Sequence, residues 1–140
     1  MPKPSPINAP PSDDVSTPQQ LSAAIARSEG EVAAGGGGRL VVLCFVTSFA
    51  PPCIAVLASL KKLQTAVGNV EVYTVAVDTP GGGSLADAHG VEVTPTLRLH
   101  VQGQMVHEMR TVSLDLIHPF VLKWSKKAKG APRATKGYEV

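Results

Sequence analysis

The sequence predicts an α/β domain in which a central mixed β-sheet of about four strands is flanked by helices on both faces. Two apolar runs, residues 39–46 and 70–78, are joined through a helical segment, which indicates a parallel pair of strands with a right-handed crossover. A closing hairpin around Gly103 adds an antiparallel pair. The chain has 140 residues, and 44% of them are hydrophobic. This is enough apolar material for one packed core, so a fully disordered chain is excluded.

The first helix is expected to begin after Thr17. Thr17 can cap it, Pro18 suits the first helical position, and Gln20 completes a capping box. The helix should end near Gly30. Its apolar stripe is interrupted by Ser28, which predicts a short buried face.

The middle of the chain alternates strands and helices. Residues 39–46 are almost continuously apolar, as in a strand covered on both faces. Apolar positions at helical spacing predict a helix over 52–67, and residues 70–78 predict a second buried strand. We expect residues 79–83 to form a loop and residues 84–90 a short helix.

The last elements are a hairpin and a helix. Residues 96–102 and 104–110 lie on either side of Gly103 and are expected to form the two strands of the hairpin. Residues 113–126 have a helical pattern that contains Pro119. Because proline lacks a backbone donor, a kink or a late start is expected there.

The two ends differ in composition from the middle. Residues 1–17 hold five of the twelve prolines and are expected to form a disordered arm before a domain at 18–125. Residues 126–140 are expected to be a flexible basic tail. Two interpretations of this tail stay open: a solvated segment, or an electrostatic contact with an anionic partner such as a membrane surface or RNA.

Composition also excludes several classes of protein. A net charge of +2 does not by itself indicate a nucleic-acid binder, and two cysteines exclude a disulfide-dense scaffold. No apolar run approaches the roughly 18 residues of a membrane span. No signal or transit peptide is evident at the N-terminus, so a cytoplasmic location is the default expectation.

Three separated landmarks resemble the thioredoxin family. Residues 41–53 resemble its strand, active-site turn and helix start, with Phe49-Ala50-Pro51-Pro52-Cys53 in place of the hallmark Trp-Cys-Gly-Pro-Cys. Val93-Thr94-Pro95-Thr96 resembles the cis-proline segment, and Gln102-Gly103 the hairpin turn. The resemblance covers about residues 18–125 and implies the thioredoxin fold, expected to be monomeric.

The departures from the family pattern concern its chemistry. Ala50 takes the place of the attacking cysteine, while the resolving position keeps its thiol, Cys53. Cys44 stands where family members usually carry a buried acid, and Phe49 replaces the tryptophan. The Pro51-Pro52 pair resembles tryparedoxins, but the insertions of that family are absent. Dithiol exchange begins with thiolate attack, so the usual two-step turnover is blocked at its first step.

Two functions follow as expectations. The first is a redox-inactive or weakly active module that binds a protein or peptide through Phe49, Ala50, Pro51, Pro52, Thr94 and Pro95. The alternative is an enzyme, a monothiol thiol-disulfide oxidoreductase or redox sensor that uses Cys53, with a glutathione adduct as one outcome. A further alternative, that Ala50 was introduced into an ordinary thioredoxin, is disfavoured because the acid and the tryptophan are lost as well.

The remaining thiol and the histidines suggest little chemistry. Cys44 is expected to pack in the core, and a disulfide with Cys53 requires α-carbons closer than about 7 Å. We expect no cofactor and no metal site, since the hairpin offers two histidines at most and zinc needs three or four ligands. If the turn is Gln102-Gly103, His100 pairs with residue 105; if it is Gly103-Gln104, His100 faces His107.

Overall fold

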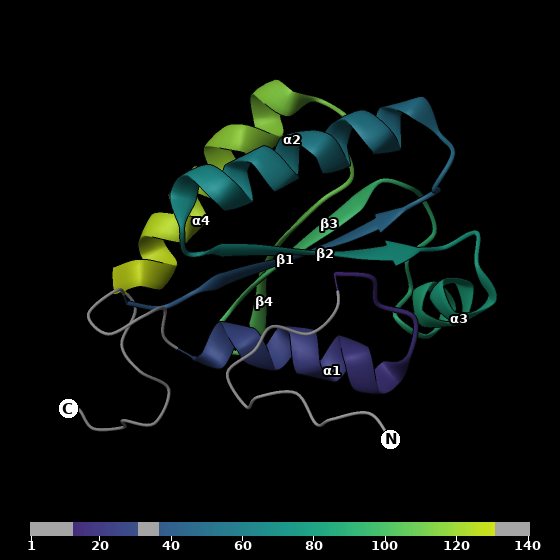
Figure 1. Cartoon of the computed structure of the whole chain (residues 1–140), viewed down its shortest axis with the longest axis horizontal. Helices are drawn as coiled ribbons and strands as arrows, with labels where there is room; N and C mark the ends of the chain where they lie inside the picture. The colour runs from purple at the N-terminus through teal and green to yellow at the C-terminus, as the bar shows by residue number, and fades with distance from the viewer. Residues whose placement is uncertain (1–12, 31–36, 131–140) are drawn as a thin grey trace, which may run out of the picture.

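The computed structural model describes residues 13–30 and 37–130, which form a four-stranded sheet between two layers of helices (Figure 1). The strand order is β2-β1-β3-β4, with β2 parallel to β1 and the other neighbours antiparallel. Helices α2 and α4 cover one face, and α1 and α3 the other. The elements are α1 (Pro18–Ala26), the 3-10 helix η1 (Arg27–Glu29), β1 (Leu40–Val46), α2 (Pro51–Val67), β2 (Val70–Ala76), α3 (Pro80–Ala88), β3 (Thr96–Val101), β4 (Gln104–Met109) and α4 (Leu114–Gly130).

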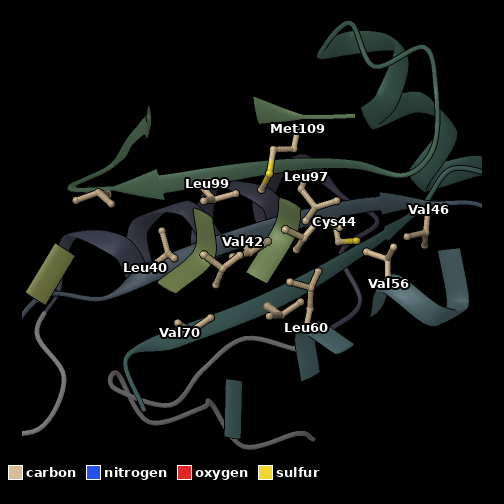
Figure 2. Packing of buried hydrophobic residues seen from close by; sticks show 14 of the residues in the cluster. Leu40, Val42, Cys44, Val46, Val56, Leu60, Val70, Leu97, Leu99 and Met109 are labelled. Atoms are coloured by element: carbon tan, nitrogen blue, oxygen red, sulfur yellow. The ribbon is translucent and has the colours of Figure 1, made fainter. Parts of the chain in front are cut away.

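Strand β1 lies at the centre of the fold, and all seven of its residues are buried. Successive side chains of a strand point to opposite faces, so β1 contributes to two separate cores. Leu40, Val42 and Cys44 point toward α2 and α4, where they pack with residues such as Val56 and Leu60 (Figure 2). The intervening side chains pack against α1 and α3 on the other face. The predicted fold class and the buried character of this strand are thereby confirmed.

The segment just before α1 differs from the expected disordered arm. Asp14 forms a parallel bridge with Thr74 at the edge of β2, and the Val15 amide donates to the Thr74 carbonyl at 2.8 Å. Val15 is only 2% exposed. The expectation was wrong for residues 13–17, because one apolar side chain and two backbone hydrogen bonds dock them against the sheet. Residues 1–12 of the predicted arm lie outside the described residues.

Helix α1 begins as expected, with the complete capping box of Thr17 and Gln20. Ser28 does not end its buried face, however, because this serine is 1% exposed. The Ser28 hydroxyl donates to the Ile25 carbonyl at 2.6 Å and accepts the Gly103 amide at 2.9 Å. Two hydrogen bonds therefore let a polar residue continue an apolar stripe and tie η1 to the hairpin turn.

The glycine run at residues 81–83 belongs to α3 and not to a loop. Thr79 caps the helix by accepting the Gly82 amide at 3.1 Å, and the helix begins at Pro80. A Cβ added at Gly82 would lie 1.9 Å from the Ala76 carbonyl oxygen. The glycines therefore allow α3 to start in direct contact with β2. Of the other predicted connector, Gly35 and Gly36 lie outside the described residues.

The hairpin turn is Gln102-Gly103, and both residues have positive φ angles, 56° and 79°. In this register His100 pairs with Met105, and His107 pairs with Leu99. The two histidines do not face each other across the hairpin. This is the pairing that the sequence predicted for a turn at Gln102-Gly103.

Helix α4 runs from Leu114 to Gly130 with Pro119 inside it. The expected late start at Pro119 was wrong, since Pro119 lies on the exposed side and the buried face is formed by Ile117, Val121 and others. The basic tail was also placed too early, because residues 126–130 are helical and Ala128 is fully buried. Residues 131–140 lie outside the described residues. No helix in the described part of the chain is long and apolar enough to cross a membrane.

Buried His100 on β3 gives a testable pH dependence. Burial lowers the pKa of its imidazole below the usual value, and its Nδ1 has no partner within the described residues. The unfolded chain therefore takes up a proton below pH about 6.5, where the folded chain still resists protonation.

We expect the free energy of unfolding to fall as the pH drops from about 7 to about 5, and His100→Phe to flatten this fall. Urea denaturation at a series of pH values measures the free energy of unfolding of each variant. The comparison variant is His89→Gln, which removes an exposed histidine that is only a minor cause of the lowered pKa of His100, so it should flatten the fall much less than His100→Phe. Equal slopes for His100→Phe and the wild type would contradict the assignment.

Candidate functional site

The N-terminus of α2 follows directly from the sequence Ala50-Pro51-Pro52-Cys53. Ala50 is the N-cap residue, with extended backbone and no side-chain hydrogen bond to the helix. Pro51 and Pro52 fit the first two helical positions because proline has the required φ angle and no amide hydrogen. Ile54 already donates to the Ala50 carbonyl at 3.0 Å. The first turn therefore leaves only the Cys53 amide to face an anion, where an ordinary helix offers three or four.

Three hydrogen bonds hold the turn before α2 against the neighbouring segments. The hydroxyls of Thr47 and Thr94 lie 2.8 Å apart, which brings the turn beside the segment of Pro95. On the other side, the Ser48 amide and hydroxyl both donate to the Asp78 carboxylate at 2.9 Å. Donation from the Ser48 amide lowers the pKa of the Asp78 carboxyl.

Neither Thr47 nor Asp78 was identified as part of the site from the sequence. Their proximity could have been predicted from the order of elements, because Thr47 follows β1 and Asp78 follows β2, and these two strands are parallel. The carboxyl ends of parallel strands meet at one edge of a sheet, so residues just after them lie close together. Asp78 forms no acid–base pair with another described residue; its carboxylate orders the loop by accepting hydrogen bonds from Ser48.

The segment facing the turn combines a buried proline with accessible backbone. The Thr94–Pro95 peptide bond is cis, and Pro95 is buried. Thr94 is half-buried, and its backbone amide and carbonyl make no backbone hydrogen bond within the described residues. Val93 directly precedes Thr94, and Phe49 lies on the turn that Thr47 joins to Thr94; their side chains are 50% and 74% exposed. This face therefore combines unpaired peptide groups of Thr94 with two exposed apolar side chains.

The two thiols lie behind this surface and are both free. Cys44 is fully buried under α2, and burial, helped by the nearby Cys53, raises the pKa of its thiol to about 12. Cys53 is 3% exposed and packs in the same core cluster. The small side chain of Ala50 therefore does not open Cys53 to solvent. Cys44 is chemically inert at neutral pH because almost none of it is thiolate.

The described residues thus bring together most of the sequence-predicted site. Phe49, Pro51 and Pro52 are exposed at the turn, and Ala50 is partly buried against the core cluster. The Thr47–Thr94 hydrogen bond places the turn beside the cis-proline segment. Cys53 lies one turn into α2 and behind this face.

A family model described as thioredoxin matches residues 28–120. This chain belongs to the thioredoxin family. Among solved structures it is similar to thioredoxin O2 from Arabidopsis thaliana in the oxidised state, with a TM-score of 0.65 and 17% identity over 80% of this chain and 92% of that one. It is also similar to Fasciola hepatica thioredoxin, with a TM-score of 0.65 and 20% identity over 79% of this chain and 96% of that one.

A third similar structure is the thioredoxin of Plasmodium falciparum, with a TM-score of 0.64 and 14% identity over 79% of this chain and 97% of that one. At these identities the solved structures establish the thioredoxin fold. No curated protein sequence matches the chain significantly.

Proposed function

We propose that this thioredoxin-family chain binds a protein or peptide partner and does not turn over as a dithiol reductase. The observation that carries the proposal is Ala50 at the N-cap of α2, the place of the family's attacking thiol. Reduction of a disulfide starts when a thiolate attacks one of its sulfur atoms and displaces the other. Alanine has no atom that can make this attack, and both cysteines of the chain are buried.

The backbone at the same place also favours loss of redox chemistry. A helix N-terminus stabilises a thiolate through its free amide groups and its dipole. Pro51 and Pro52 remove two of these amides. The anion-stabilising field is therefore weakened along with the loss of the sulfur.

The features that support partner binding do not need sulfur. Thr94 has unpaired backbone groups that can bond an extended peptide in the manner of strand addition. Phe49 on the turn and Val93 next to Thr94 expose apolar surface that a partner would cover. Hydrogen bonds from Ser48 to Asp78 order the turn, so less entropy is lost when a partner binds.

Two measurements test the proposal together. In an insulin-reduction assay with dithiothreitol, the chain should precipitate insulin no faster than dithiothreitol alone. In parallel, peptides selected from a display library on the wild-type protein should lose at least about tenfold in affinity for Phe49→Ser, since exposed aromatic side chains commonly dominate such interfaces.

The matched control for the second measurement is Met105→Ser, which removes an exposed apolar side chain on β4, far along the chain from the turn. Met105→Ser should bind the selected peptides like the wild type. Insulin reduction by the natural chain, or equal losses of affinity in both variants, would contradict the proposal.

A second candidate function is a monothiol reaction of Cys53. The position favours it, because Cys53 lies in the first turn of α2 and keeps the only free amide there. In this reaction the Cys53 thiolate attacks oxidised glutathione, a new S–S bond forms to one glutathione, and the other leaves as a thiolate. No further oxidant is needed.

We expect oxidised glutathione to leave Cys53 unmodified in the folded chain, because the side chain is 3% exposed. Mass spectrometry after mild incubation measures the adducts on each cysteine. The same incubation in urea should modify both Cys44 and Cys53. Rapid modification of Cys53 in the folded wild type, lost in Cys53→Ser, would instead favour the monothiol function.

A further inference from the structure

A pocket of about 390 Å³ lies behind the N-terminus of α2, on the side away from the cis-proline segment. Its walls come from α2, from the ends of β1 and β2, and from residues 14–16. Figure 1 shows that β1 and β2 end on the side of the molecule where α2 begins. Neither Phe49 nor Thr94 lines this pocket, so it is separate from the proposed partner surface.

Thr74 supplies the polar group of this pocket. The register pairs Thr74 with Cys44, so its side chain points to the α2 face of the sheet, into the pocket that it lines. Thr74 is 8% exposed, and its hydroxyl makes no hydrogen bond to another of the described residues. The hydroxyl oxygen is not completely buried, so a ligand in the pocket can reach it and form a hydrogen bond with it.

The hydroxyls of Thr47, Ser48 and Thr79 also line the pocket but are already engaged. Thr47 bonds Thr94, Ser48 donates to Asp78, and Thr79 caps α3. Thr74 therefore has a hydroxyl available for a ligand where its neighbours do not.

The remaining walls define the chemistry of a ligand. Val15, Ile54, Leu57 and Ala76 make most of the lining apolar. Among the described residues, no basic side chain lines the pocket and Asp14 is acidic, so a negatively charged ligand would find no counter-charge there and is disfavoured. The volume lies within the range of about 300–1,000 Å³ that is typical of small-molecule sites.

We propose that this pocket binds a neutral, mainly apolar small molecule whose single hydroxyl or carbonyl group pairs with the Thr74 hydroxyl. Its apolar body lies against Leu57 and the Cys53 side chain on α2. The pocket adjoins the proposed partner surface through Thr47 and Ser48, but neither Phe49 nor Thr94 lines it, so the two kinds of binding can be tested separately.

The experiment uses octanol as the probe and the full-length chain. Amide signals of Val15, Cys53, Leu57 and Thr74 are followed by nuclear magnetic resonance as octanol is added. We expect saturable shifts confined to these residues and their neighbours. Octanoate, which has the same chain length and a negative charge, should bind at least about tenfold more weakly.

Thr74→Val tests the hydrogen bond, because it keeps the side-chain shape and removes the hydroxyl. Octanol should bind this variant about fivefold or more weakly. The matched control is Thr65→Val, which changes an exposed hydroxyl on α2 and should leave the affinity unchanged. Ala76→Leu, which fills the pocket, should abolish the shifts while the thermal unfolding transition is retained.

Several outcomes would overturn the proposal. The first is an absence of shifts in the wild type, or shifts that do not saturate or that spread over the whole surface. The second is equal octanol affinity of Thr74→Val and the wild type. The third is octanoate binding as tight as octanol binding. Thr74→Val decides the question even if Ala76→Leu fails to fold. A loss of partner binding in Phe49→Ser with octanol binding intact would show that the two sites fail independently.

Discussion

Replacing Ala50 with cysteine is expected to raise the dithiol reductase activity of this chain. The new thiol would stand at the N-cap of α2, three residues before Cys53. This restores the spacing of the family's two cysteines, of which the first attacks the substrate disulfide and the second releases the mixed disulfide. Insulin reduction with dithiothreitol should rise at least about tenfold over the wild type, because a missing attacking group blocks the first step outright.

The gain should stay below that of an ordinary thioredoxin. Pro51 lacks the amide that glycine supplies at this position of the hallmark motif, and Cys44 stands in place of the usual buried acid. Ala50→Ser is the matched control, since it adds a polar atom of similar size without sulfur, and it should remain inactive. The double variant Ala50→Cys/Cys53→Ser should lose multiple turnover, because nothing then releases the mixed disulfide. An Ala50→Cys protein as inactive as the wild type would show that the fold around the turn, and not the missing thiol, prevents the chemistry.

Replacing Gly82 with alanine is expected to destabilise the domain by at least about 2–3 kcal/mol. The added Cβ would lie 1.9 Å from the Ala76 carbonyl oxygen and 2.9 Å from the Thr79 hydroxyl that caps α3. Neither neighbour can move aside easily. The Ala76 carbonyl belongs to the backbone of β2, and the Thr79 hydroxyl is held by its hydrogen bond with the Gly82 amide. The helix must therefore move away from the sheet and give up its contact with β2.

Urea denaturation followed by the fluorescence of Trp124, the single tryptophan, measures this loss. Gly130→Ala is the matched control, because a Cβ at this helical position meets nothing within 4 Å. The control should change the free energy of unfolding by less than about 1 kcal/mol. Similar values for the two variants would mean that α3 does not start in close contact with β2.

Much of the fold followed from local patterns. The continuous apolar run of β1 predicted a strand covered on both faces, and all seven of its residues are buried. The capping box of Thr17 and Gln20 forms as expected. Gln102 and Gly103 form the hairpin turn, and their positive φ angles set the register of His100. Each of these features depends on residues within a few positions of one another, so the chain specifies them locally.

Other features were missed because they depend on distant partners. Val15 is buried only because β2 offers an open edge beside it. Ser28 is buried because Gly103, 75 residues away, donates to its hydroxyl. The start of α3 among three glycines depends on the close approach to Ala76. Local composition favoured a loop or an exposed position in each case, and a tertiary contact outweighed that preference.

The candidate site divides in the same way. The sequence by itself determined that no sulfur stands at residue 50 and that the first turn of α2 lacks two amides, since both are covalent facts about alanine and proline. Only the tertiary structure decided that Cys53 is buried, that Thr47 joins Thr94, and that the Thr74 hydroxyl faces a pocket. The physical reason is that burial and hydrogen bonding belong to pairs of groups that meet in space, and no local pattern records which groups will meet.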